Sequence, residues 1–171
     1  MSSKLLDSGN YSLLDLPAQF ENPLEGISTI DLSKNFEPEK EIETLRNKLK
    51  SSSDWDVRND AIQRVMSLVK SGAFQYPDFD LNELAPGIAE CVTDLRSTLV
   101  KWGSLCASAC AQTLGNKFSN FIDIFLPAFF KQTTHGTAII AQSCRLAILQ
   151  IVECVPHRRT VRSILSKANS K

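Results

Sequence analysis

The chain of 171 residues carries no net charge, because 19 lysines and arginines balance 19 aspartates and glutamates. A neutral molecule exerts no long-range attraction on nucleic acids or anionic membranes, so a charged partner has to be met by a local patch. Long apolar runs are also missing: the most apolar stretch, residues 118–130, is too short to span a bilayer and contains Asp123 and Pro127. Residues 1–10 lack the apolar core of a secretory signal. We therefore expect neither a nucleic acid nor a membrane as the partner.

Signatures of catalysis are absent as well, since the sequence has no glycine-rich phosphate loop, metal-ligand motif or nucleophile elbow. No carboxylate or nucleophile is placed by sequence to orient His135. The five cysteines include no C-x-x-C pair and fall among apolar residues, which is typical of reduced, buried, intracellular thiols. Cys106 and Cys110 lie one helical turn apart, but no further ligand stands at metal-binding spacing. We expect no enzyme activity, no metal and no cofactor.

Strand signals are missing too, because the sequence has no Asn-Gly turn and no sustained alternation of apolar and polar residues. Residues 1–37 show no sustained period, and we expect a mostly disordered leader whose apolar clusters either stay free or dock on this domain or on a partner. From residue 38 to 171 the sequence predicts one helical domain. Its expected helices cover residues 39–51, 55–71, 81–93, 96–115, 120–133, 137–154 and 157–167.

These helices form pairs that repeat. Three sets of residues recur at successive spacings of 43 and 40: Val57, Val100 and Ile140; Ala61, Ser104 and Cys144; Leu68, Ala111 and Ile151. This period is typical of HEAT or armadillo units, in which antiparallel helix pairs stack because one pair cannot bury its apolar face alone. We predict an all-α solenoid with these three sets pointing inward. The last expected helix has no mate, so the array is expected to be incomplete at its C-terminus and to leave Val161, Ile164 and Leu165 partly exposed.

Trp55 stands at the start of the second helix, where water can reach it. An aromatic side chain in this place can fill a pocket on a partner at low entropic cost. The alternative is that its indole folds back onto a neighbouring helix. Asp54 and Asp94 occupy two of the preceding turns, where a carboxylate can cap the helix that follows. Trp102 lies off the centre of its apolar stripe and is expected to pack between helices.

Four short runs carry a family resemblance: residues 55–58 (WDVR), 94–101 (DLRSTLVK), 114–118 (LGNKF) and 126–131 (LPAFFK). With these runs, residues 39–167 resemble a TOG domain, most closely that of the CLASP N-terminal family, with the cilia-associated TOG-array proteins nearby. A complete TOG domain has about six helix pairs. The resemblance therefore implies a partial TOG domain.

The resemblance implies a protein that binds the tubulin heterodimer or the microtubule and modulates microtubule growth or stability. The turns inside successive helix pairs would line one edge and grip tubulin, with Trp55 as the apolar anchor. Arg96 and Lys101 would pair with tubulin carboxylates, Lys101 being the better placed if it faces outward. The full set of expected tubulin-binding residues is Trp55, Arg58, Arg96, Lys101, Thr134, His135, Arg158 and Arg159. The implied place is the cytoplasmic microtubule cytoskeleton, with cilium, mitotic spindle and kinetochore left open.

Two other functions stay open from the residues alone. One is a HEAT-type adaptor that holds another protein along its inner groove without affinity for tubulin. The other is nucleic-acid binding through a basic face, which the neutral overall charge argues against. The same face begins at His157 with Arg158 and Arg159, and such a cluster is either a phosphate or carboxylate site or a solvated helix start. The basic face comprises Arg158, Arg159, Arg162 and Lys167.

Overall fold

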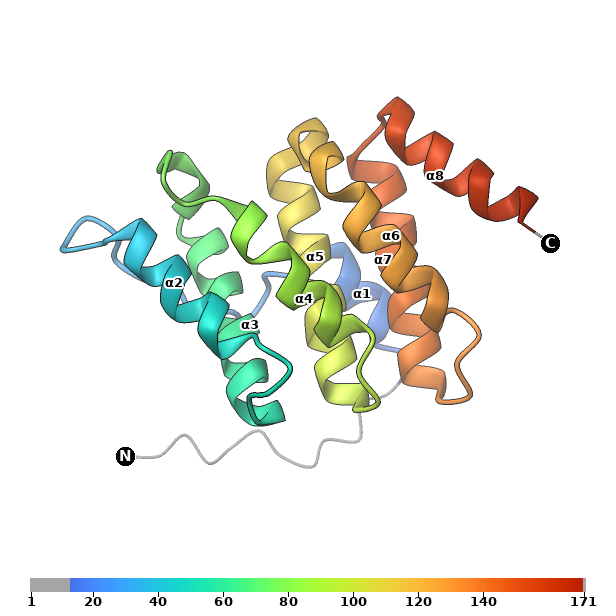
Figure 1. Cartoon of the computed structure of the whole chain (residues 1–171), viewed down its shortest axis with the longest axis horizontal. Helices are drawn as coiled ribbons and strands as arrows, with labels where there is room; N and C mark the ends of the chain where they lie inside the picture. The colour runs from blue at the N-terminus through green and yellow to red at the C-terminus, as the bar shows by residue number, and fades with distance from the viewer. Residues whose placement is uncertain (1–12, 171) are drawn as a thin grey trace.

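The computed structural model describes residues 13–170, which form a curved array of helices with no strand among them (Figure 1). Short 3-10 helices precede two of the α-helices. None of the helices in this part of the chain is both long and apolar enough to cross a membrane. In chain order the elements are α1 (Leu16–Glu21), α2 (Pro38–Lys48), α3 (Trp55–Lys70), η1 (Ala73–Gln75), η2 (Leu81–Glu83), α4 (Ala85–Val92), α5 (Ser97–Leu114), η3 (Gly115–Phe121), α6 (Ile122–Gln132), α7 (Ala138–Cys154) and α8 (Arg158–Asn169).

The helices from α2 to α7 form three antiparallel pairs stacked in two layers. Helices α3, α5 and α7 make up one layer, in which α5 packs between its two neighbours. Helices α4 and α6 pack against this layer and against each other, and α8 continues the array beyond α6 (Figure 1). The predicted all-α solenoid of antiparallel helix pairs is confirmed. All seven expected helices begin within two residues of an observed α-helix or 3-10 start.

The helix expected over residues 120–133 corresponds to α6, which is preceded by a longer 3-10 segment than expected. Here η3 runs from Gly115 and passes directly into α6. The helix expected over residues 81–93 is also divided, into η2 and α4. Pro86 lies in the first turn of α4, where its missing N–H and fixed φ favour a helix start over a helix interior. Both differences therefore concern helix ends, which leave the order of the helices unchanged.

The repeat register is confirmed at eight of its nine positions. The sets around Ala61 and Leu68 are fully buried, and the aligned pair Ser104 and Cys144 is in direct contact, with Oγ and Sγ 3.9 Å apart. Val57 is the exception, because 37% of its surface is exposed although Val100 is buried. Helix α2 contacts α3 less extensively than α4 contacts α5, which fits the exposure of Val57 in the first turn of α3.

The leader differs from the prediction. Residues 1–12 lie outside the described part of the chain, but residues 13–37, which we call the leader segment, are packed against the array rather than mostly disordered. Leu16 and Phe20, one turn apart on α1, are fully buried against α5 and α7. Of the expected alternatives for its apolar clusters, docking on this domain is the one that the structure shows. Because these contacts join residues far apart in sequence, local periodicity in the sequence does not predict the docking of the leader segment.

Side chains of the array hold the leader segment by its backbone. Gln112 donates to the carbonyl oxygens of Phe20 and Glu21, at 3.4 and 3.0 Å. Further along, the N–H of Ile30 donates to the hydroxyl of Ser71, 2.7 Å away. Lys70 Nζ donates to the carbonyl oxygen of Ile27 at 2.7 Å, and the Tyr76 hydroxyl donates to the carbonyl oxygen of Leu32 at 3.2 Å. The segment therefore crosses the layer of α7, α5 and α3.

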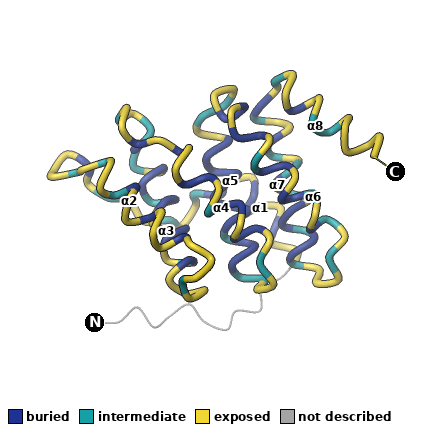
Figure 2. The backbone as a smooth tube through the Cα atoms, in the orientation of Figure 1, coloured by how far each residue is buried: buried dark blue, intermediate teal, exposed yellow. Residues whose placement is uncertain are grey.

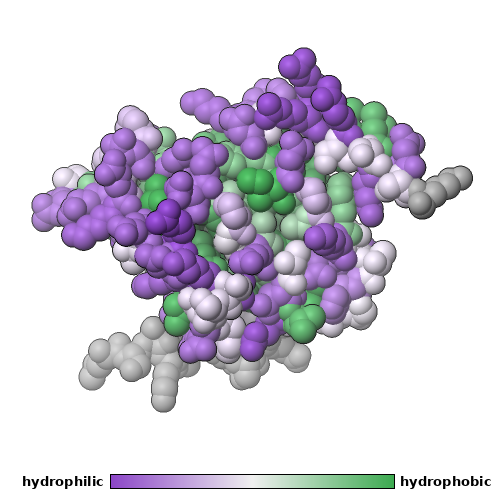
Figure 3. Space-filling view, viewed as in Figure 1, coloured by the Kyte–Doolittle hydropathy of each residue, from purple (hydrophilic) through white to green (hydrophobic). Residues whose placement is uncertain are grey.

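Burial follows the two layers. Buried residues run through the centre of the array, whereas α8 is mostly exposed (Figure 2). As expected, Val161 and Leu165 are exposed on α8, and Ile164 is half-buried against the core. The face that Figure 3 shows is largely hydrophilic at its margins, with apolar atoms visible between the helices near its centre.

Candidate binding edge at the turns within helix pairs

The turns inside the three helix pairs meet at one edge of the array, the lower edge in Figure 1, because the helices of each pair are antiparallel. The turns between pairs lie at the opposite edge. We call the first of these the turn edge and define it by residues 49–55, 93–96 and 133–137. A flat series of turns on rigid helices is a suitable place for a binding surface, since loops tolerate exposed side chains that a helix core does not.

Trp55 is the first residue of α3 and exposes 43% of its surface at the turn edge. The expected exposed aromatic side chain is therefore present, and its indole is not folded away between helices. The preceding residue, Asp54, holds the N-cap position, but its side chain makes no capping hydrogen bond. Instead, Asp56 accepts from the N–H of Val57 at 2.8 Å. The expected capping role of the Asp54 carboxylate is wrong.

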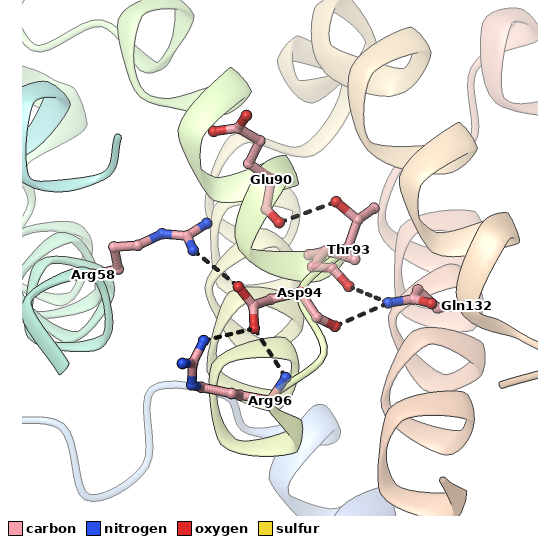
Figure 4. A network of polar contacts seen from close by, with 7 residues as sticks. Arg58, Glu90, Thr93, Asp94, Arg96 and Gln132 are labelled. Carbon is pink, nitrogen blue, oxygen red and sulfur yellow. Dashed lines mark hydrogen bonds and ion pairs between the residues drawn. The ribbon is translucent and has the colours of Figure 1, made fainter. Parts of the chain in front are cut away.

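Asp94 is the centre of a polar network behind the turn edge (Figure 4). One carboxylate oxygen accepts from the Arg58 guanidinium at 2.9 Å, and the other accepts from the N–H of Arg96 at 2.9 Å. Arg96 is the N-cap residue of α5, so Asp94 orients the start of that helix without being its cap. Burial disfavours the Asp94 carboxylate, but the hydrogen bonds from Arg96 and Arg58 outweigh burial and lower its pKa.

The same turn is tied to the third helix pair. Gln132, at the end of α6, donates from Nε2 to the carbonyl oxygens of Val92 and Asp94, at 3.1 and 3.3 Å (Figure 4). Arg58 comes from the first pair, Asp94 from the second and Gln132 from the third. The network therefore fixes the relative positions of successive turns along the edge.

Arg58 itself is not available to a partner. Only 5% of its surface is exposed, because its guanidinium is turned inward to Asp94. This burial does not fit the direct contact with tubulin expected for Arg58, and the residue instead positions the turn of the second pair. Arg96 differs, because its side chain is exposed and its Nη1 lies 3.6 Å from Asp94, a long and solvated ion pair. It stays available at the turn edge.

Leu95 is a candidate that the sequence reasoning missed. It lies between Asp94 and Arg96, and 85% of its surface is exposed, more than that of Trp55. The signal that could have found it is a large apolar residue in a short polar turn, flanked on both sides by charged residues. Such a residue cannot belong to the apolar stripe of α5, which begins with Leu99 and Val100.

Lys101 does not face outward. Only 1% of its surface is exposed, its Nζ donates to Gln19 Oε1 at 3.4 Å, and it lies 4.7 Å from the centroid of the Trp102 ring. Burial lowers the pKa of Lys101 to about 8. The outward orientation on which its expected contact with tubulin depended is therefore absent, because the docked leader segment covers the position. Trp102 is half-buried between helices, as expected.

The third turn places Thr134 and His135 at the turn edge. Thr134 is exposed, whereas His135 is half-buried and its Nδ1 accepts from the N–H of Thr137 at 3.0 Å. The carbonyl of Thr133 accepts from Arg145 Nε at 2.9 Å, which holds the turn against α7. Thr134 is thus accessible, and His135 mainly shapes the turn.

Arg158 and Arg159 begin α8, and α8 follows a turn between pairs, so both lie at the opposite edge (Figure 1). Arg159 donates to Asn120 Oδ1 at 3.3 Å, and its N–H donates to His157 Nδ1 at 3.2 Å. These two arginines therefore do not lie at the turn edge with Trp55, and their expected contact with tubulin stays a prediction. The antiparallel arrangement separates them by the length of a helix.

The cysteines are free thiols, four buried and Cys154 half-buried. A hydrogen bond to Cys110, followed by burial, raises the pKa of Cys106 well above its ordinary value, and burial raises that of Cys144 to about 12. Thiols of this kind are poor nucleophiles and poor metal ligands at neutral pH. Within residues 13–170, no three side chains of histidine, cysteine, aspartate or glutamate are placed to hold a metal ion.

Comparison with known proteins finds sequence similarity along most of the chain. The family model described as CLASP N terminal matches residues 39–171. CLIP-associating protein 1 of Xenopus tropicalis is 26% identical over 155 residues, covering 89% of this chain and 11% of that protein. Protein CLASP-1 of Caenorhabditis briggsae is 23% identical over 157 residues, covering 89% of this chain and 12% of that protein.

A plant relative also matches most of this chain with a small part of its own length. The CLIP-associated protein of Arabidopsis thaliana is 30% identical over 125 residues, covering 72% of this chain and 8% of that protein. The chain thus spans about a tenth of the length of the curated relatives it matches. Because the family model covers all three helix pairs and α8, the chain belongs to the CLASP N-terminal family.

Proposed function

We propose that this chain binds tubulin, as the free heterodimer or in the microtubule, through the turn edge, and that it modulates microtubule growth or stability without chemistry of its own. Membership of the CLASP N-terminal family and the resemblance to TOG domains support a microtubule partner. The observation that carries the proposal is the exposure of Trp55, Leu95 and Arg96 on one edge of a rigid array. The proposed place of action is the cytoplasmic microtubule cytoskeleton.

Two exposed apolar side chains would supply most of the affinity. Trp55 and Leu95 lie in successive turns of the same edge, and a partner that covered them would remove large apolar surfaces from water. Binding energy at interfaces is concentrated in a few such residues, with tryptophan and arginine prominent among them. Arg96 beside Leu95 would add a salt-sensitive attraction to carboxylates of the partner. Thr134 would extend the contact to the third turn.

The proposed set is narrower than the set expected from the sequence. Arg58 acts behind the surface, where its ion pair with Asp94 fixes the turn that presents Leu95. Lys101 is covered by the leader segment, and Arg158 and Arg159 lie at the opposite edge. Preorganised turns reduce the entropy that association has to overcome, so the Arg58–Asp94 pair would support binding indirectly.

Co-sedimentation with microtubules and size-exclusion chromatography with tubulin dimer would test the proposal. Trp55→Ala and Leu95→Ala should each weaken binding by about 2 kcal/mol, roughly thirtyfold, as at other interface hot spots. Leu149→Ala is a matched control, because Leu149 is an exposed leucine on α7 away from the turns. The control should bind like the wild type.

Two results would contradict the proposal. One is the absence of any interaction between the wild-type chain and tubulin dimer or microtubules at low ionic strength, which would favour the adaptor function. The other is unchanged binding by both Trp55→Ala and Leu95→Ala while circular dichroism shows intact helix content. In the second case tubulin would contact a surface other than the turn edge.

A further inference from the structure

A groove of about 770 Å³ lies between α6 and α8, on the outer layer of the array. Its lining is basic and hydroxylated, with Lys131 from α6 and, from α8, Arg159, Arg162, Ser163, Ser166 and Lys167. Figure 3 shows hydrophilic atoms gathered over the region of α8 on this face. None of the residues proposed to contact tubulin lines the groove.

The positive charge of the groove is not neutralised internally. Among the described residues, Asp123 is the only acidic residue that lines the groove, against four lysines and arginines. Across the described residues, no ion pair involves any of those four cations. The Arg159 guanidinium donates to the neutral amide oxygen of Asn120 at 3.3 Å. The groove is thus a local positive patch on a molecule without net charge.

The periodicity of α8 builds this lining. Arg159, Arg162, Ser163 and Ser166 recur at helical spacing and line the groove, whereas Val161 and Leu165 do not. Arg162 and Ser166 also border the apolar surface that Val161 and Leu165 form on the adjoining side of the helix. The start of α8 is fixed, because the buried Thr160 hydroxyl donates to the carbonyl of Val155 at 2.9 Å. The basic residues therefore project from a helix whose first turn is anchored.

We propose that the groove between α6 and α8 binds an acidic polypeptide segment. Unpaired arginines and lysines provide charge-assisted hydrogen bonds to carboxylates, and the serine hydroxyls can bond to a peptide backbone. Pro127 and the half-buried Phe130 add a small apolar floor for side-chain stems. This interaction goes beyond the proposed contact with tubulin at the turn edge, since the two surfaces share no residue.

A nucleic acid fits the groove less well. Single-stranded nucleic acids are bound through aromatic side chains that stack successive bases along a basic track. Within the part of the chain that the structure describes, Phe130 is the only aromatic residue that lines the groove. A duplex requires an extended line of phosphate contacts, and the neutral chain offers little long-range attraction to one. An acidic peptide needs only the short basic groove that is present.

Fluorescence anisotropy with a fluorescein-labelled peptide of alternating glutamate and glycine would test this directly on the full chain. The same peptide with glutamine in place of glutamate serves as the neutral probe and should not bind. The double substitution Arg162→Gln with Lys167→Gln should weaken binding of the acidic peptide about tenfold, as expected for the loss of two partly solvated ion pairs. Both positions are exposed, and circular dichroism checks that the fold is kept.

A matched control removes the same charge elsewhere. Lys48→Gln with Lys50→Gln changes two exposed lysines at the end of α2 and the turn after it, and should leave peptide binding unchanged. Trp55→Ala should also leave it unchanged, so failure of the tubulin proposal and failure of this one can be told apart. Equal weakening by both double variants, or no binding by the wild type at low salt, would overturn the proposal. Tighter binding of a single-stranded DNA oligonucleotide, lost in the Arg162 and Lys167 variant, would also overturn it in favour of a nucleic-acid site.

Discussion

The guanidinium of Arg58 and the carboxylate of Asp94 lie 2.9 Å apart, both largely removed from water, and they join α3 to the turn before α5. Each residue belongs to a different helix pair, so the ion pair crosses the boundary between two repeats. An isolated exposed ion pair adds little to stability. A buried one makes each partner dependent on the other, because a charge left without its partner inside the protein is costly.

Asp94→Ala is therefore expected to lower the free energy of unfolding by about 3 kcal/mol, since it leaves the Arg58 charge buried and unpaired. Urea denaturation followed by circular dichroism measures the change. The double variant Arg58→Leu with Asp94→Ala removes both charges and should be more stable than Asp94→Ala alone. If the double variant instead costs the sum of the Asp94→Ala and Arg58→Leu costs measured separately, the two residues are not energetically coupled.

The lowered pKa of the buried Lys101 predicts a specific dependence of the free energy of unfolding on pH. Folding lowers its pKa from 10.5 to about 8, so between these values the unfolded chain binds more protons and the free energy of unfolding rises with pH. Relative to Lys101→Met, the wild type should gain on the order of 3 kcal/mol between pH 7.5 and 10.5. Denaturation of both proteins across this range measures the gain.

The comparison with Lys101→Met is needed because buried thiols act in the opposite direction. Folding raises the pKa of Cys91 to about 11 and that of Cys144 to about 12, so above pH 9 these groups lower the stability as pH rises. Both proteins contain the same cysteines, and their difference therefore isolates Lys101. A constant difference across the range would contradict the burial of the Lys101 ammonium group beneath the leader segment.

Phe20 tests whether the leader segment is part of the folded domain. Phe20→Ala is expected to lower the free energy of unfolding by about 3 to 5 kcal/mol, because the ring is fully buried and its loss leaves a cavity between α1 and the array. Chemical denaturation provides the measurement. Leu14→Ala is the control in the same segment, since most of the Leu14 surface is exposed, and it should change stability by less than about 0.5 kcal/mol. Similar values for the two variants would mean that α1 does not dock in solution.

Gly87 marks a close approach between α4 and the end of α2. A Cβ atom at Gly87 would lie 2.8 Å from Cβ of the buried Leu49, closer than packed carbon atoms come. Gly87→Ala should therefore lower the melting temperature and cost about 1 to 3 kcal/mol, as other overpacked sites do. At Gly136, a Cβ would meet no atom within 4 Å, so Gly136→Ala should be close to neutral. A stabilising effect of Gly87→Ala would mean that helix propensity outweighs the contact.

The fold was predictable because its determinants are periodic. The spacing near 40 residues placed Ser104 opposite Cys144, and the two side chains are in contact in the structure. Helix starts followed from local signals, as at Trp55, where a helix was expected and begins. The start of α4 beside Pro86 was not placed in this way, because the expected helix began at residue 81. The leader segment could not be predicted in this way, because Gln19 meets Lys101 and Gln112 meets Phe20 across 82 and 92 residues.

The candidate site was predictable only where exposure depends on local position. Trp55 begins a helix and is exposed, as the sequence indicates. Arg58 has the same local appearance as a surface arginine, and only its partner 36 residues away turns it inward. Leu95 was missed because an apolar residue next to a helix start is more often assigned to the core. Its exposure depends on the tertiary position of the turn.

The leader segment changes how the array is expected to unfold. In a simple solenoid each repeat contacts only its neighbours, so terminal repeats can open while the rest stays folded. Here one stretch of chain contacts α7 and α5 through Leu16 and Phe20 and reaches the first pair through Ser71 and Tyr76. It acts as a tie between the two ends of the three-pair stack, and opening either end has to break contacts with the other. The three pairs should therefore melt as a single cooperative unit.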